Sequence, residues 1–375
     1  MHISEKYRDL IQKEIDRLQK HEGKPKIQPQ DIAVIRILQD MLRDDQLPWE
    51  KSFISPSVNV ISKKQYSGIN RWILPGGEYI TFNQLMAYNK SHKTHFVIPK
   101  VTDEDKGYTR FMKSPFPVIH YNVKPPRDAT EAEIKRYQDG KKVFGLFLDD
   151  KTNTFKVQPP ASTSYFRVYN TIYIFDSETG EQFPRLNIEK YITLFEGDKI
   201  IQEYQKLSGV KIFYDTPGRC FYTRREDAIH MSPLGTFKPT KKNLDPVVEY
   251  YSTSFHEMVH STGTKERCDR DCFLAEGRFG SMDYSMEECV AELGSALLLS
   301  ELNVDHDKIN KTLDNSSSYI SGWLDFLLFS DKNDKYGKGA EKIMYAIRRA
   351  EKARNYILSW FKEIGSDSSN KVNDN

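Results

Sequence analysis

Residues 245–263 read DPVVEYYSTSFHEMVHSTG, and this stretch decides the fold of the second half of the chain. Asp245 is a good helix cap, Pro246 suits the first helical position, and Gly263 suits the exit. Apolar residues recur along one face at helical spacing. The sequence therefore predicts a helix over residues 246–262.

His256 and His260 lie four residues apart on this helix and form, with Glu257, an HExxH motif. Residues i and i+4 of a helix lie one above the other, so both imidazoles project at a spacing that one metal ion accepts. Glu257 lies one step round the helix, close enough to a metal-bound water to take its proton. The motif predicts two ligands and a catalytic base.

A third ligand is expected from a second predicted helix, over about residues 284–301. Glu288 and Glu292 stack at i and i+4 there, so Glu288 can bind the metal while Glu292 holds the free ring nitrogen of a ligand histidine. Glu287 is the rival third ligand, because a register shift of one residue cannot be read from sequence. The alternative is that these acids simply face solvent at a helix N-terminus.

Two histidines, one glutamate and a water make an open, catalytic arrangement, and we expect one Zn²⁺ per chain. Zinc polarises a carbonyl and lowers the pKa of its water to about 7, which favours peptide hydrolysis. The run Ala228–Met231 would suit an edge strand that holds an extended peptide, with His230 more structural than catalytic. Cys268 and Cys272 are a second zinc option, although reduced thiols are the expectation.

Composition excludes several classes of protein. The 375 residues carry 55 Lys+Arg against 53 Asp+Glu, a net charge of +2, which excludes a polycationic tail protein. No apolar run is long enough to span a membrane and the N-terminus has no signal core, so we expect a cytoplasmic protein without a membrane partner. Residues 51–130 hold twelve Lys or Arg against five Asp or Glu, a local excess that indicates a polyanion partner.

The basic half mixes aromatic and cationic residues, as proteins that bind single strands do. Aromatic faces can stack on bases while cations contact phosphates, although a solvated loop with buried aromatics would have the same composition. The candidate DNA-binding residues are Trp49, Lys51, Lys63, Lys64, Tyr66, Arg71 and Trp72.

Periodicity and turn residues predict the remaining elements. Helices are expected over 4–22, 31–45, 188–208, 306–329 and 338–364, with a solvated helix at 129–141 that begins with a Thr130/Glu133 capping box. Strands are expected at 79–82, 116–121, 165–175 (buried), 211–214 and 221–231, the last as a hairpin turning at 225–227. Residues 183–187 are the expected domain boundary.

Several motifs follow one another along the chain: Leu47-Pro48-Trp49, the run Asn59–Asn70 with its core Tyr66-Ser67-Gly68-Ile69-Asn70, Phe166-Arg167-Val168-Tyr169-Asn170, Ile229–Pro233, Phe255–Gly263, Glu287–Gly294 and Tyr319–Leu324. In these motifs and their order the chain resembles the ArdC family of antirestriction proteins. The resemblance covers about residues 31–360. It implies a single-stranded DNA-binding domain joined to a zincin-like metallopeptidase domain, and a role in protecting incoming DNA of mobile elements from restriction. The gluzincin pattern that it shares favours Glu288 as ligand with Glu292 behind it.

The expected fold is α+β with two domains: a basic mixed α/β DNA-binding domain, and a mainly helical zincin-like domain with a small sheet. The expected boundaries are a helical extension at 1–29, the DNA-binding domain at 30–185, the metallopeptidase domain at 186–365 and a disordered tail at 366–375. Expected partners are single-stranded DNA, with double-stranded DNA as a second option, and a DNA-associated protein substrate. The rival hypothesis is a DNA-masking protein without proteolysis, whose metal site only stabilises the fold.

Overall fold

The computed structural model describes residues 3, 5–20, 28–44, 57–122, 124–149, 152–159, 162–186, 195–238, 245–274, 281–302, 334–337 and 339–361. The chain is a mixture of helices and mostly antiparallel strands, so the predicted α+β class is confirmed. No helix in these ranges is both long and apolar enough to cross a membrane.

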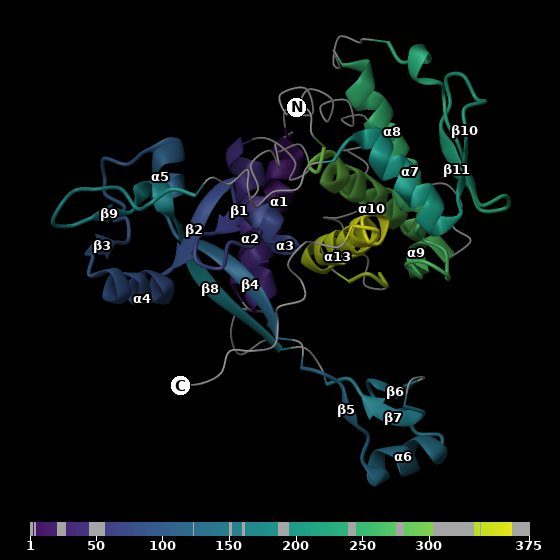
Figure 1. Cartoon of the computed structure of the whole chain (residues 1–375), viewed down its shortest axis with the longest axis horizontal. Coiled ribbons are helices and arrows are strands. Elements are labelled where there is room, and N and C mark those ends of the chain that lie inside the picture. The colour runs from purple at the N-terminus through teal and green to yellow at the C-terminus, as the bar shows by residue number, and fades with distance from the viewer. Residues whose placement is uncertain are drawn as a thin grey trace.

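A four-stranded sheet forms the centre of the N-terminal half (Figure 1). Its strands, in spatial order, are β1 (Ser57–Asn59), β2 (Gly77–Thr81), β8 (Ser162–Asn170) and β4 (Phe116–Asn122). β1 runs parallel to β2, while β8 is antiparallel to both β2 and β4. Short elements cover its ends: α4 (Phe82–His92), β3 (Phe96–Val97), α5 (Gly107–Lys113), a 3₁₀ turn (Thr171–Tyr173) and β9 (Phe175–Asp176).

A small separate sheet is inserted between β4 and β8. It has the order β5-β7-β6, with strands β5 (Arg127–Asp128), β6 (Leu146–Asp149) and β7 (Thr154–Val157), and it carries helix α6 (Glu131–Gln138). Figure 1 shows this unit standing away from the rest of the molecule. The Thr130/Glu133 capping box at the start of α6 is present as predicted.

Helices make up most of the C-terminal half. They are α7 (Gly197–Ser208), α8 (Pro246–Ser261), α9 (Asp271–Leu274), α10 (Met282–Leu299) and α13 (Gly339–Ile357). A three-stranded sheet of order β10-β12-β11, with strands β10 (Lys211–Phe213), β11 (Phe221–Thr223) and β12 (Ala228–His230), lies beside α8.

The two halves meet through three N-terminal helices: α1 (Glu5–Gln19), α2 (Pro29–Asp44) and α3 (Ile69–Ile73). α2 packs against β4 on one side and α13 on the other, and α13 in turn packs on α10 (Figure 1). One cluster of buried apolar residues consequently extends from Ile3 to Leu358 and includes residues of both predicted domains.

Most predicted elements are confirmed, and three expectations need correction. The strand predicted as buried over 165–175 is β8, which ends at Asn170. Residues 162–167 of β8 are mainly exposed, because this part of the strand extends beyond the core. The helix predicted from 188 begins at Gly197, because Phe195 pairs as a bridge with Leu302. The third correction concerns the run Ala228–Met231, which was expected at the edge of a sheet and lies next to the candidate site described below. Residues 306–329, predicted as a helix, and the tail at 366–375 lie outside the described residues.

Candidate metal centre

Two helices hold the candidate site, and a glycine lets them approach closely. α8 begins as predicted, with the Asp245 side chain accepting hydrogen bonds from the backbone N–H groups of Val247 and Val248. α10 packs against α8, and a Cβ placed on Gly294 of α10 would lie 2.7 Å from Cγ2 of Val259. Any larger residue at position 294 would therefore push apart the helices that carry the predicted ligands.

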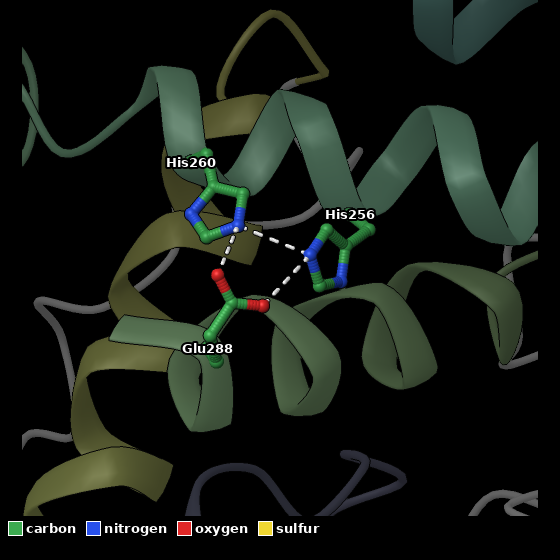
Figure 2. A group of neighbouring side chains, drawn as sticks. All are labelled: His256, His260 and Glu288. Atoms are coloured by element: carbon green, nitrogen blue, oxygen red, sulfur yellow. Dashed lines mark hydrogen bonds and ion pairs between the residues drawn. The ribbon is translucent and has the colours of Figure 1, made fainter. Parts of the chain in front are cut away.

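His256, His260 and Glu288 come together between these helices (Figure 2). The Nε2 atoms of His256 and His260 are 3.0 Å apart. Glu288 Oε2 lies 3.5 Å from His256 Nε2, and its Oε1 lies 3.6 Å from His260 Nε2. Two nitrogens and a carboxylate thus form a triangle of donors.

The shape and chemistry of this triangle fit a divalent ion. Tetrahedral Zn²⁺ has imidazole and carboxylate ligands at about 2.0–2.2 Å, so neighbouring ligand atoms lie roughly 3.4 Å apart. The three measured separations, 3.0, 3.5 and 3.6 Å, are close to that value. Among the described residues, this is the one group of His, Cys, Asp and Glu side chains with metal-binding geometry.

Glu287, the rival ligand, has a different position. Its Oε1 lies 3.1 Å from Nδ1 of His260, on the far side of the ring from the donor triangle. The buried guanidinium of Arg270 donates to both of its oxygens, at 2.5 and 2.9 Å, and Cys272 Sγ donates to Oε2 at 3.2 Å. Burial raises the pKa of Glu287, but Arg270 and His260 outweigh it and lower that pKa to about 2. An ionised Glu287 can fix the Nδ1–H tautomer of His260 and leave Nε2 for a metal.

His256 has a corresponding partner in Glu292. Glu292 Oε1 lies 3.4 Å from His256 Nδ1, the ring nitrogen that faces away from the triangle. Burial lowers the pKa of His256, but Glu292 and Glu288 raise it well above its ordinary value. Burial likewise raises the pKa of Glu288, while His256 and His260 lower it. The group therefore concentrates negative charge around two imidazoles, as a site for a cation requires.

Glu257 is held by the small sheet. Its Oε2 accepts a hydrogen bond of 2.8 Å from the backbone N–H of Tyr222 in β11, and the residue is 8% exposed. Because a backbone donor fixes one carboxylate oxygen, the other oxygen, Oε1, can take a proton. The sequence suggested the base but gave no sign that β11 holds it.

The predicted edge strand is wrong. β12, which contains Ala228–His230, is the central strand, and β11 occupies the side next to α8. β10 pairs with β12 in parallel from the other side, a long-range pairing that the local pattern did not indicate. His230 faces Asp215 and Glu226, with nitrogen–oxygen distances of 2.9 and 3.1 Å, and these partners agree with a structural role.

The cysteines do not form a second metal group among the described residues. Cys268 Sγ donates to the carbonyl of Lys352, and Cys272 Sγ donates to Glu287. All four cysteines are unpaired thiols.

The predicted DNA-binding residues are dispersed. Trp49 and Lys51 lie outside the described residues, and Lys63 and Lys64 are exposed on the turn after β1. Tyr66 is largely buried with its hydroxyl accepting from Asn59, and burial raises its pKa to about 12.

Arg71 and Trp72 are corrected to structural residues. Trp72 is 3% exposed within the main core, so its ring cannot stack on a base. Arg71 Nη2 is bonded to Glu301 Oε1 at 2.8 Å, an internal partner in place of a phosphate. Both side chains belong to the junction between the halves.

Arg270 is the residue at the site that sequence reasoning missed. It is fully buried and also donates to Thr262 and to the carbonyls of Val259 and His260. It lies in a loop without periodic pattern, between Asp269 and Asp271, where a solvated ion pair is the ordinary expectation. No local signal indicated its burial.

Residues 199–336, which include α8, α10 and the donor triangle, match the family model of the zincin-like metallopeptidases. The chain contains a zincin-like metallopeptidase domain. This confirms the zincin-like domain that the resemblance implied for the second half of the chain.

Curated relatives extend over more of the chain. An uncharacterized protein, y4eC, of Sinorhizobium fredii is 25% identical over 311 residues, which cover 78% of this chain and 81% of that protein. The DNA primase TraC of Escherichia coli is 27% identical over 319 residues, or 84% of this chain. The match spans 25% of that primase.

Two solved structures of the antirestriction protein ArdC from plasmid R388 are also similar. The metal-free form is 19% identical with a TM-score of 0.49, and the alignment covers 96% of this chain and all of that one. The Mn(II)-bound form is 20% identical with a TM-score of 0.48, and the alignment covers 94% of this chain and 97% of that one.

Proposed function

We propose that this protein is a DNA-binding antirestriction protein whose zincin-like domain hydrolyses peptide bonds. The observation that carries the enzymatic part is the donor triangle of His256, His260 and Glu288 with a held carboxylate, Glu257, beside it. We further propose residues 30–185 as the DNA-binding domain and residues 186–365 as the metallopeptidase domain, with 1–29 as a helical extension.

The proposed ligands are Nε2 of His256, Nε2 of His260 and the Glu288 carboxylate, with Zn²⁺ as the proposed ion. When bound, zinc supplies Lewis-acid polarisation of a carbonyl and makes water more acidic. Manganese or cobalt can use the same donors. Glu287 and Glu292 hold the outer nitrogens of the two imidazoles, at 3.1 and 3.4 Å, so each ring keeps its orientation and tautomer.

Glu257 is the proposed general base. It takes the proton of the attacking water and then gives it to the departing amine, so one carboxylate performs both transfers. The N–H of Tyr222 fixes Oε2 at 2.8 Å, which orients the carboxylate before substrate arrives. A positioned base of this kind contributes typically 10²–10⁴-fold to rate.

The DNA-binding part is supported by charge and by the relatives. Residues 51–130 carry a net charge of +7, and Lys63 and Lys64 are exposed there. TraC, which matches most of the chain, is named a DNA primase. The motifs that resemble ArdC support the proposed role in protecting incoming mobile-element DNA. Bound DNA would raise the effective concentration of the protease near a DNA-associated protein.

The test compares wild type with Glu257→Gln. Each protein, with zinc content measured, is incubated with single-stranded DNA and a mixture of DNA-binding proteins, and new peptide termini are identified by mass spectrometry. We expect termini from wild type, at least 10²-fold fewer from Glu257→Gln, and equal zinc in both.

The rival hypothesis predicts a different pattern. If both proteins hold zinc, neither generates termini and both protect DNA equally, the metal site is structural and the proteolytic part of the proposal is wrong. In that case His256→Ala would still impair protection, because it destabilises the domain.

A further inference from the structure

The inserted unit between β4 and β8 has a surface that the candidate site does not use. We call its described residues, 124–149 and 152–159, the arm. β4 and β8 pair in register up to Asn122 and Ser162, so a short hairpin turn could have joined them. The chain instead forms a separate sheet and α6, which stand apart from the core in Figure 1.

The arm exposes large aromatic rings. Phe144 is 75% exposed and Tyr137, near the end of α6, is 54% exposed. Tyr137 contacts Phe155 of β7, with ring centroids 5.5 Å apart, and more than half of its surface still faces solvent. The buried apolar clusters of the described residues contain neither Tyr137 nor Phe144.

A tight turn at Gly145 follows Phe144 directly. Gly145 has a φ of +73°, and its carbonyl accepts from the N–H of Gln158 at 2.8 Å. A Cβ at Gly145 would lie 2.4 Å from the carbonyl oxygen of Gln158, so the close approach requires glycine. The backbone just after Phe144 therefore has one allowed geometry, which fixes the direction of the chain that carries the exposed ring.

Cations lie close to these rings in the sequence. Residues 135–144 contain Lys135, Arg136, Lys141 and Lys142 against one acid, Asp139. All four cations are exposed and have no ion pair with another described residue.

The end of α6 brings part of this cluster together. The Lys141 N–H donates to the carbonyl of Arg136 and the Gly140 N–H to that of Tyr137, at 2.9 and 3.0 Å, with Gly140 left-handed at φ +72°. This is a Schellman turn, which folds the chain back over the last turn of the helix. Cations at a helix C-terminus suit its dipole, but the dipole does not explain the exposed rings.

We infer that the arm is a contact site for single-stranded nucleic acid, with Phe144 and Tyr137 stacking on bases and Lys141 and Lys142 contacting phosphates. Exposed aromatic rings and unpaired cations close together in the chain are the combination that binds single strands without sequence preference. This inference rests on the proposed DNA binding and assigns part of it to a segment outside residues 49–72.

The experiment uses the full chain and a labelled oligo(dT) of about 20 nucleotides, longer than the site of one binding fold. Fluorescence anisotropy gives the affinity over a series of salt concentrations. Phe144→Ala should weaken binding roughly five- to tenfold, as expected for loss of one stacked base. Lys141→Gln/Lys142→Gln should weaken binding and reduce the slope of log K against log salt by about 1.4.

Matched controls lie in the zincin-like domain. Lys211→Gln/Lys265→Gln removes two exposed cations, and Phe213→Ala removes a 42% exposed ring. Both should bind as wild type does. A further variant replaces residues 123–161 by an Asn-Gly turn between the paired residues Asn122 and Ser162. It should bind more weakly than either arm variant while keeping the zinc content of wild type.

The outcomes separate the two proposals. If wild type binds oligo(dT) and every arm variant binds equally well, the arm inference is wrong while DNA binding stands. If wild type does not bind, both are wrong. Arm variants that bind DNA normally but cleave fewer proteins would make the arm a protein-binding surface and overturn the inference.

Discussion

At the scale of single residues, His260 is held by a chain of polar side chains behind the donor triangle. Its Nδ1 faces Glu287, and Glu287 in turn accepts two hydrogen bonds from the fully buried Arg270. A buried ion pair adds little net stability, because desolvation of both charges opposes their attraction. Its value here lies in geometry, since it leaves His260 one orientation and one tautomer.

We predict that Glu287→Gln weakens zinc binding about 10–100-fold, the usual effect of losing a partner behind a metal ligand. The amide has the same size, but its NH₂ group cannot accept a hydrogen bond from Arg270, so one of the two Arg270 hydrogen bonds is lost. Competition with a fluorescent chelator gives the affinity, and urea unfolding of the metal-free protein gives the stability.

Glu301→Gln is the matched control for this prediction. Glu301 is also buried and also paired with arginines, but no histidine in the part of the chain that the structure describes is bonded to it. It should lower stability without changing zinc affinity. Equal losses of zinc affinity in the two variants would show that Glu287 acts only through folding.

At the scale of elements, the contact of α8 with α10 determines whether the triangle can form. His256 and His260 belong to α8 and Glu288 to α10, so the distance between the helix axes fixes the ligand separation. Gly294 is the point of closest approach, with Val259 opposite.

Gly294→Ala should destabilise the protein by about 1–3 kcal/mol, because the added methyl would meet Val259 Cγ2 at 2.7 Å. It should also weaken zinc binding, since Glu288 moves with α10. Adding Val259→Ala removes the opposing methyl groups and should restore zinc affinity. A double-mutant cycle with non-additive zinc affinities would establish the contact, and additive losses would contradict it.

Elements whose formation depends on near neighbours in the chain could be predicted from sequence. The Asp245 cap, the α8 helix and the hairpin turn near Asp227 were predictable because caps, periodicity and turns depend on near neighbours. The central place of β12 was not, because it depends on β10, a strand from an earlier segment. Trp72 had the aromatic character of a base-stacking residue, and only tertiary packing shows that it is buried.

Within the candidate site, sequence could not decide whether Glu287 or Glu288 faces the donor triangle. Glu287 and Glu288 are neighbours in the chain, and the helix register that separates their roles cannot be read from sequence. A rotation of about 100° per residue on α10 directs Glu288 toward both Nε2 atoms and Glu287 toward the outer nitrogen of His260. That rotation is set by packing on α8 and by Arg270, which lies 17 positions earlier in the chain.

At the scale of the whole molecule, a triad centred on the buried Glu301 joins the two halves. Glu301, just after α10, accepts from Arg71 of α3 at 2.8 Å and from Arg354 of α13 at 2.5 Å. The Gly68 N–H before α3 also donates to Glu351 of α13, at 3.2 Å. Residues far apart in sequence thus fix the N-terminal half on the zincin-like domain.

Removing the central carboxylate should loosen this junction. Glu301→Gln leaves two guanidinium groups without their charge partner, so we expect a loss of about 3 kcal/mol in the free energy of unfolding. Glu203→Gln is the control, because Glu203 forms ion pairs with Lys199 and Lys206 on the surface and its loss should change stability little.

The pH dependence of this loss tests its electrostatic origin. Burial raises the pKa of Glu301, but Arg71 and Arg354 outweigh it and hold that pKa below the ordinary value. A carboxyl whose folded pKa is lowered stabilises the protein above its unfolded pKa, about 4.3, and this contribution is lost as pH falls through the folded pKa. The stability difference between wild type and Glu301→Gln should therefore be constant above about pH 5 and shrink on further acidification. Urea unfolding from pH 7 to pH 3 measures it, and a difference that persists unchanged at pH 3 would mean that packing rather than charge holds the halves together.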